Sequence, residues 1–95
     1  PYLVSKNALE IALLNLSKIY SWKKIKINII RPGVIKTKKS TKINNYTKNI
    51  FLKRVTKIPV GQAGNPRDIS NYVKYLIDDK SKFIFGQVIT IAGGE

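Results

Sequence analysis

Tyr2 and Lys6 are the side chains near the start of the chain whose types and spacing could do chemistry. A separation of four residues places both on one face of a helix. A tyrosine hydroxyl normally titrates near ~10, so by itself it is a poor acid or base at neutral pH. A neighbouring ammonium stabilises the phenolate form. The pair could therefore exchange a proton with a carbonyl or alcohol oxygen, although Tyr and Lys at this spacing are common in proteins.

The composition narrows the chemistry further. The 95 residues include no cysteine and no histidine. This excludes disulfides, Ser-His-Asp triads, Cys-His pairs and the usual zinc sites within the chain, and we expect no metal. Proton transfer must come from Tyr, Lys, Asp or Glu, or from a group outside the chain.

The charge is strongly positive, with 18 Lys and Arg against 5 Asp and Glu, a net charge of +13. Such a charge suits a nucleic acid or an anionic membrane surface, so a small basic binding module is the alternative function. The abundance of Lys, Ile and Asn is also what A/T-rich coding would produce, and no nucleic-acid-binding motif accompanies the charge. We favour ordinary solvated lysines, with an acidic ligand, such as a phosphorylated cofactor or an acidic carrier protein, as an intermediate interpretation.

The elements that must position these side chains can be outlined from hydrophobic spacing. A helix is predicted over 2–21, with an apolar face wide enough for a second burial surface such as another subunit. A strand is predicted over 25–30 and is expected to stop at Pro32-Gly33. The stretch 36–57 indicates a lid with a possible helix in its second half.

A second helix and strand follow. Asn65 is predicted to cap a helix that has Pro66 at its first position and Asp68 in its first turn. A strand is predicted over 86–91. The order helix, strand, lid, helix, strand predicts a parallel sheet in an α/β protein. Because two strands do not make a stable doubly wound sheet, we expect further strands upstream.

Four ordered segments, 2–6, 28–37, 60–69 and 86–94, are together similar to the short-chain dehydrogenase/reductase family. They match its Tyr-x-x-x-Lys motif, its strand with Asn followed by Pro-Gly-x-x-x-Thr, its Gly-rich link with a Pro-started helix, and its closing Gly-Gln and Gly-Gly strand. The similarity covers nearly the whole chain and is weakest in the lid. It implies that residues 1–95 are the C-terminal portion of a single doubly wound, Rossmann-like domain.

The resemblance also implies roles. The activity would be hydride transfer between nicotinamide and a carbonyl or secondary alcohol. Tyr2 would be the general acid in reduction and the general base in oxidation, and Lys6 would stabilise its phenolate and hydrogen-bond the nicotinamide ribose. The residues implied to bind the cofactor are Tyr2, Lys6, Pro32, Gly33, Val34, Ile35 and Thr37. Residues 38–57 would form the substrate lid.

The implied cofactor is NAD or NADP, with NADPH slightly favoured. Members that reduce 3-oxoacyl groups on carrier proteins are the most similar, so the expected substrate is a small-molecule or carrier-bound carbonyl compound. A homodimer or homotetramer in the cytoplasm is expected, with no nucleic-acid or membrane partner. The family's Gly-rich phosphate turn, catalytic serine and NAD/NADP-selecting residue do not occur in these 95 residues. The chain alone is therefore expected to be inactive.

Overall fold

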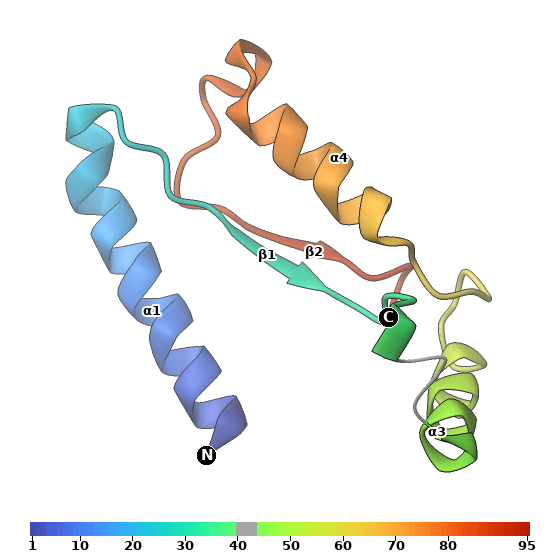
Figure 1. Cartoon of the computed structure of the whole chain (residues 1–95). Helices are drawn as coiled ribbons and strands as arrows, with labels where there is room; N and C mark the ends of the chain where they lie inside the picture. The colour runs from blue at the N-terminus through green and yellow to red at the C-terminus, as the bar shows by residue number, and fades with distance from the viewer. Residues whose placement is uncertain (40–43) are drawn as a thin grey trace.

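The computed structural model of the chain describes residues 1–39 and 44–95. Its elements in chain order are α1 (Tyr2–Tyr20), the 3-10 turn η1 (Ser21–Lys23), β1 (Ile29–Pro32), α3 (Asn45–Val55), α4 (Pro66–Ile77), the 3-10 turn η2 (Asp79–Ser81) and β2 (Val88–Ile91) (Figure 1). The predicted order of elements and the α/β class are confirmed. Part of the predicted lid, residues 40–43, lies outside the described residues.

The first helix, α1, agrees with its prediction to within one residue. It begins directly after Pro1, its N-cap residue. It ends at Tyr20, and the chain then turns at Lys24, which has a left-handed φ of 62°. Near this end Ser17 is 2% exposed and lies under Gly86, where an added Cβ would come within 2.7 Å of the serine Oγ. Gly86 therefore allows α1 to pack closely against the turn that leads into β2.

The strand β1 is displaced from its predicted position, 25–30, because it begins at Ile29 and includes Pro32. The N–H of Gly33 donates to the carbonyl of Ile91 at 2.9 Å. Since successive N–H groups of a strand point to opposite edges, the Pro32 nitrogen lies on the edge away from β2. Its missing N–H therefore removes no bond between the two strands. The predicted stop at Pro32-Gly33 is confirmed, because the strand ends at Pro32, whereas the predicted start at residue 25 was wrong.

Two polar side chains hold the segment that precedes β1. The Lys26 Nζ donates to the carbonyl oxygens of Leu76 and Ser81, both at 2.7 Å, and to the Ser81 Oγ at 2.5 Å. The Asn28 Nδ2 donates to the carbonyl of Ile84 at 3.0 Å. Carbonyls at the end of a helix lack partners within it, and a cation there also complements the helix dipole. Lys26 therefore secures the end of α4 against the start of the sheet.

The two strands pair in parallel, as predicted, with Ile29 opposite Val88 and Pro32 opposite Ile91. Parallel neighbours need a long crossover between them. Here the crossover consists of the segment with α3 and of α4, which brings the carboxyl ends of both strands to the same edge of the sheet (Figure 1).

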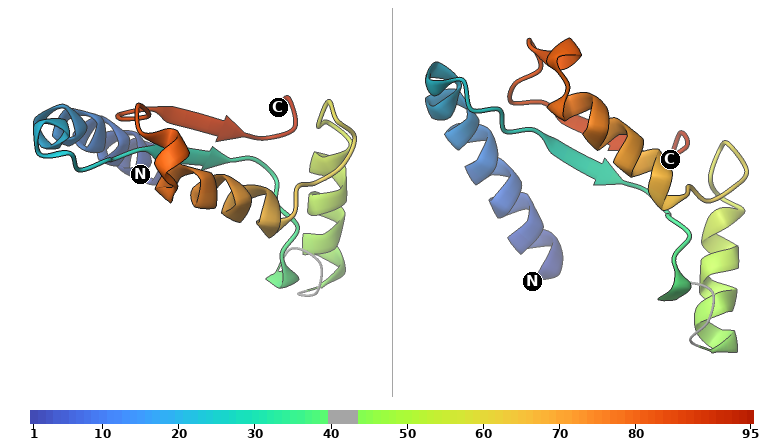
Figure 2. Two further views of the ribbon diagram at one scale, coloured as in Figure 1. Left: turned by 90° about the horizontal axis from the view of Figure 1, so that it is seen from above. Right: turned by 45° about the horizontal axis from the view of Figure 1, so that its top comes forward.

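The helices α1 and α4 cover opposite faces of this sheet. The Arg31 guanidinium forms an ion pair with the Glu10 carboxylate of α1. The preceding residue, Ile30, lines a hollow with Val73 and Leu76 of α4. Neighbouring residues of a strand point to opposite faces, so one helix lies on each. The right view of Figure 2 shows β1 passing between the two helices.

The start of α4 is determined locally and was predicted correctly. Asn65 is the N-cap residue and Pro66 is the first helical residue. The Asp68 Oδ2 accepts a hydrogen bond from the Asn65 N–H at 2.7 Å. This satisfies one of the backbone donors that a helix start leaves without an intrahelical partner.

The described residues bury little apolar surface. Among them, the buried hydrophobic residues are Val34 and Ile58, at 8% and 4% exposure. The radius of gyration is 16.0 Å, whereas a compact domain of this length has about 12 Å. The large aliphatic residues of α1 that stay exposed are Leu3, Val4, Leu9, Ile11, Leu16 and Ile19. The second burial surface predicted for this helix is therefore open in the structure.

We predict that Lys26→Met destabilises the full-length protein by about 1–2 kcal/mol, because three part-buried hydrogen bonds from the ammonium are lost. The Leu76 carbonyl keeps its bond from the Ser81 hydroxyl, and the Ser81 carbonyl keeps its bond from the Ile84 N–H. Urea unfolding followed by circular dichroism would measure the change, and hydrogen exchange should increase at the end of α4. Lys23→Met, at an exposed lysine of η1, is the control and should change the stability by less than about 0.5 kcal/mol. Equal stability of Lys26→Met and the wild type would contradict this account.

Candidate active site

Tyr2 and Lys6 lie on one face of α1, as their spacing predicted. The Lys6 Nζ lies 5.5 Å from the centroid of the Tyr2 ring. A cation over a tyrosine ring is attracted by the electrons of its face. The Tyr2 side chain is 75% exposed, so a ligand can reach its hydroxyl. The structure thus holds an ammonium and a phenol together at an accessible position.

The direction of α1 determines where this pair lies relative to the sheet. The helix runs antiparallel to β1, so its N-terminus points toward the carboxyl ends of the strands (Figures 1 and 2). Ligands of open α/β sheets bind beyond the carboxyl ends of the strands. Tyr2 and Lys6 are therefore at the end of the sheet where such a ligand would lie.

The chain leaves the sheet at Pro32, the last residue of β1, and Gly33, the residue after it. A Cβ on Gly33 would lie 2.6 Å from the Cβ of Ala92, the residue after β2. Real Cβ atoms do not approach so closely, so only glycine lets the two backbones meet here. Gly33, which the sequence placed in a Pro-Gly turn, is thus required here because the backbone packs closely against the end of the other strand. Ala92 was not recognised as part of this site from the sequence.

Beyond this turn, Ile35 forms an isolated parallel bridge with Gly64. The Gly64 N–H donates to the Val34 carbonyl at 2.9 Å, and the Lys36 N–H donates to the Gly64 carbonyl at 2.8 Å. In a parallel bridge these two bonds use the neighbours of Ile35, so its own N–H and C=O point away from Gly64. The peptide groups of Ile35 are thus directed toward the other side of this segment, where they could bind a ligand.

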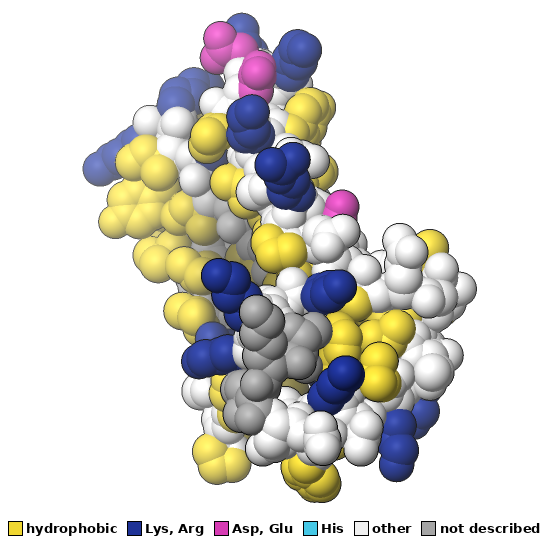
Figure 3. Space-filling model, turned by 45° about the vertical axis from the view of Figure 1, so that its right-hand side comes forward, with side chains coloured by type: hydrophobic (Ala, Val, Ile, Leu, Met, Phe, Trp, Pro, Cys, Tyr) yellow, Lys and Arg dark blue, Asp and Glu magenta, His cyan; other side chains and the backbone are white. Residues whose placement is uncertain are grey.

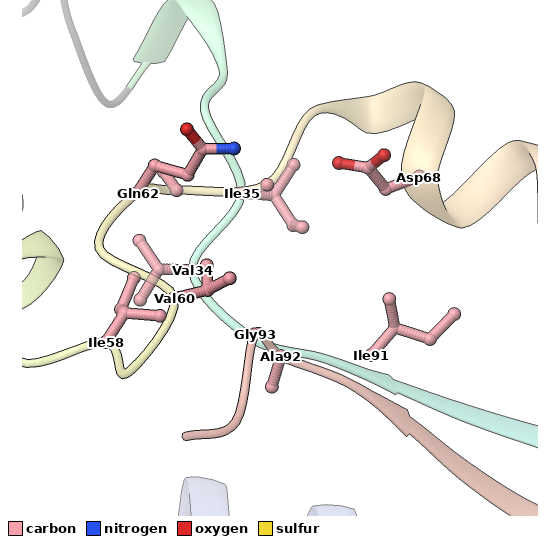
Figure 4. Close-up of a pocket in the computed structure, with 11 residues that line it drawn as sticks. Val34, Ile35, Ile58, Val60, Gln62, Asp68, Ile91, Ala92 and Gly93 are labelled. Atoms are coloured by element: carbon pink, nitrogen blue, oxygen red, sulfur yellow. The ribbon is translucent and has the colours of Figure 1, made fainter.

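A hollow of about 370 Å³ lies at the carboxyl ends of the strands (Figure 4). Figure 4 shows Val34, Ile58 and Val60 grouped on one side, with Ile35 and Asp68 on the other. The residues that line it are Val34, Ile35, Ile58, Val60, Gln62, Ala63, Gly64, Asp68, Ile91, Ala92 and Gly93. The hollow has a ligand-sized volume and a mostly apolar lining.

The structure brings the predicted residues to one end of the sheet without joining them into one cavity. The hollow includes Val34 and Ile35, but its lining does not include Tyr2 or Lys6. Pro32, Ile35 and Thr37 line a separate, shallow apolar surface against α4. The loop 58–64 supplies much of the hollow's wall. From the sequence it was interpreted as a connection punctuated by Gly and Pro, and as part of a motif similar to the family's Gly-rich link, but not as a wall of the site.

The whole chain, residues 1–95, matches a family model described as enoyl-(acyl carrier protein) reductase. The chain is 39% identical over 79 residues to 3-oxoacyl-(acyl-carrier-protein) reductase of Chlamydia trachomatis, an alignment that covers 83% of this chain and 31% of the relative. It is 32% identical to 7alpha-hydroxysteroid dehydrogenase of Clostridium sardiniense, over 98% of this chain and 35% of the relative. The chain belongs to the short-chain dehydrogenase/reductase family. It spans about a third of the length of these two relatives.

Solved structures of this family have the same arrangement of elements. A 4-hydroxyisoleucine dehydrogenase complexed with NADH is 29% identical and superposes with a TM-score of 0.78, over 98% of this chain and 37% of the other. The elements described above therefore match part of a Rossmann-type fold. The doubly wound fold class predicted from the sequence is confirmed.

The residues of this family member fit the nicotinamide end of a dinucleotide. Tyr2 and Lys6 present a hydroxyl and an ammonium, and the Ile35 bridge directs peptide groups away from Gly64. Those donors and acceptors match ribose hydroxyls and a carboxamide. No Gly-x-Gly-x-x-Gly phosphate turn occurs in the 95 residues, so the fit concerns this end of the cofactor alone.

The basic side chains do not form one patch on the face seen in Figure 3, where they are separated by apolar and neutral polar ones. A binding module for a polyanion needs its cations gathered along a surface. Within the described part of the chain, no helix is long and apolar enough to cross a membrane. The scattered charge on the face in Figure 3 gives no support to a module that binds nucleic acid or an anionic membrane surface, and that alternative stays a prediction.

We predict that Gly33→Ala destabilises the paired strands by about 1–3 kcal/mol, because its Cβ would overlap Ala92. Chemical unfolding would give the loss, and hydrogen exchange should increase at the Gly33 N–H. Pro32→Ala is the neighbouring control: it keeps a Cβ in place and should change the stability by less than about 1 kcal/mol. A Gly33→Ala variant as stable as this control would show that the strands can separate there at no cost.

Proposed function

We propose that this chain supplies the proton-transfer groups and the nicotinamide end of an NAD(P)-dependent oxidoreductase, which moves hydride between nicotinamide and a carbonyl or secondary alcohol. The observation that carries the proposal is the Tyr2–Lys6 pair on one face of α1. The pair lies at the end of the sheet where β1 ends with Pro32 and the chain continues into Gly33. Membership of the short-chain dehydrogenase/reductase family supports the same class of reaction.

The proposed chemistry divides between the helix and the strand end. The nicotinamide, when bound, donates or accepts the hydride. The Tyr2 Oη gives a proton to the carbonyl oxygen during reduction and takes it back during oxidation. The Lys6 Nζ stabilises the phenolate and donates to the ribose hydroxyls. A hydrogen-bonding group outside these 95 residues would orient the substrate oxygen, while Tyr2 supplies the single proton that the reduction needs.

The strand end would hold the nicotinamide itself. In this proposal the Ile35 peptide groups and the Thr37 side chain bind the carboxamide. Pro32, Gly33 and Val34 form the wall beside it. NADH and NADPH remain alternatives, because the group that would select between them does not occur in these 95 residues. NADPH is slightly favoured.

The proposed substrate is a carbonyl compound, either small or linked to a carrier protein. The similarity to the chlamydial 3-oxoacyl-(acyl-carrier-protein) reductase supports the carrier-linked alternative, and a net charge of +13 suits an acidic carrier. The similarity to the hydroxysteroid dehydrogenase supports a small substrate. A homodimer or homotetramer is proposed for the full-length protein, supported by the exposed apolar residues of α1.

We predict that Tyr2→Phe in the full-length protein lowers kcat/KM for carbonyl reduction about 10²–10⁴-fold, because the proton donor is lost while the ring stays. NADPH, followed by its fluorescence, should still bind, because Lys6 and the groups at the strand end remain. Tyr75→Phe, which removes a hydroxyl from α4, is the matched control and should keep the wild-type rate. An unchanged rate of reduction in Tyr2→Phe would refute the role proposed for this side chain.

The isolated 95-residue chain is predicted to show no oxidation of NADH or NADPH with a carbonyl substrate. It has no phosphate-binding turn, and it leaves much of its apolar surface open. Absorbance at the nicotinamide band would follow the reaction, with the full-length protein as the positive control. Turnover by the isolated chain would contradict the proposal that the rest of the cofactor site lies outside these 95 residues.

A further inference from the structure

A second hollow, of about 760 Å³, lies beside the strand-end hollow, between α3 and the loop that precedes α4. Its volume is in the range of small-molecule sites. The residues that line it are Lys36, Lys48, Phe51, Leu52, Val55, Gly61, Gln62, Ala63 and Asn65. Gln62 and Ala63 line both hollows, so the two adjoin.

One face of α3 forms the wall of this hollow. Lys48, Phe51, Leu52 and Val55 follow the spacing i, i+3, i+4, i+7, which places them in one row along the helix. Phe51 and Val55 are half-buried and Leu52 is 49% exposed. The wall is therefore basic in the first turns of α3 and apolar over the rest.

The charge of the lining is positive, with Lys36 on the segment after β1 and Lys48 on α3. No Asp or Glu is among the described residues that line it. Lys48 lies in the first turns of α3, where the helix dipole also favours an anion. The first turn of α4 is less suitable, because the Asp68 carboxylate already accepts from the Asn65 N–H there.

We propose that this hollow binds the anionic group and the apolar chain of an amphiphilic substrate. The anion, a carboxylate or a phosphate, lies between Lys36 and Lys48. The apolar chain lies along Phe51, Leu52 and Val55. The inference deepens the proposed function, because it assigns the substrate of that site a class: acyl-type carbonyl compounds that carry a negative charge.

The test is a binding measurement that needs no cofactor and no turnover. Isothermal titration of the full-length protein with decanoate, decyl phosphate and 1-decanol compares three ligands with the same apolar chain. The two anions are expected to bind more tightly than the alcohol, with affinities that fall as salt rises, because the lysines are exposed and screened. The stronger of the two anions identifies a carboxylate or a phosphate as the preferred group.

Lys48→Gln should weaken the binding of the preferred anion about 3- to 5-fold, the size expected for one exposed ion pair, and leave the alcohol unchanged. Lys53→Gln makes the same change of charge on α3 outside the lining and should bind all three ligands as the wild type does. Leu52→Ser should weaken all three ligands together.

Equal binding of decanol and the anions, or equal effects of Lys48→Gln and Lys53→Gln, would overturn the proposal. The result is separable from the proposed reaction, because Tyr2→Phe should lower the rate of reduction without changing these affinities. If Tyr2→Phe kept the wild-type rate while Lys48→Gln weakened anion binding as expected, the reaction assignment would fail and the binding site would stand.

Discussion

The parallel pairing of β1 with β2 is the contact on which the other features depend. Residues 33–87 must form a crossover because the two strands run in the same direction. The crossover places α4 on one face and leaves the other face to α1, and it brings Gly33 next to Ala92. The chemically useful groups gather at the carboxyl edge because both strands end there.

The close approach at Gly33 restricts which residue can stand there and fixes the path of the chain that follows. A side chain at this position would push the strands apart, so the residue after β1 must be glycine. In return, the chain that continues from it bridges to Gly64 and holds the Ile35 peptide in a fixed direction. A binding segment without regular structure is thereby held by two backbone contacts rather than by side chains.

The helix α1 differs from this strand end in how it is supported. It carries the Tyr2–Lys6 pair at one end, and near the other end it is fixed by Ser17 under Gly86. Between them, Glu10 pairs with Arg31, and much of the apolar face is exposed. The relatives are about three times as long as this chain. We interpret the open face of α1 as a surface for further parts of the domain or for another subunit.

The sequence by itself determined the features that depend on neighbours along the chain. The spacing of apolar residues located the helices, and Asn65 with Asp68 located the start of α4, because capping involves residues three apart. Four short motifs in order along the chain indicated the family and the residues expected at its site, because each motif is a run of neighbouring residues. The limits of β1, the Lys26 contact with the end of α4, and the hollow walled by Lys48 and Phe51 came only from the tertiary structure. Each joins segments far apart in the chain, and neither the alternation of a strand nor the spacing of a helix specifies which distant groups will meet.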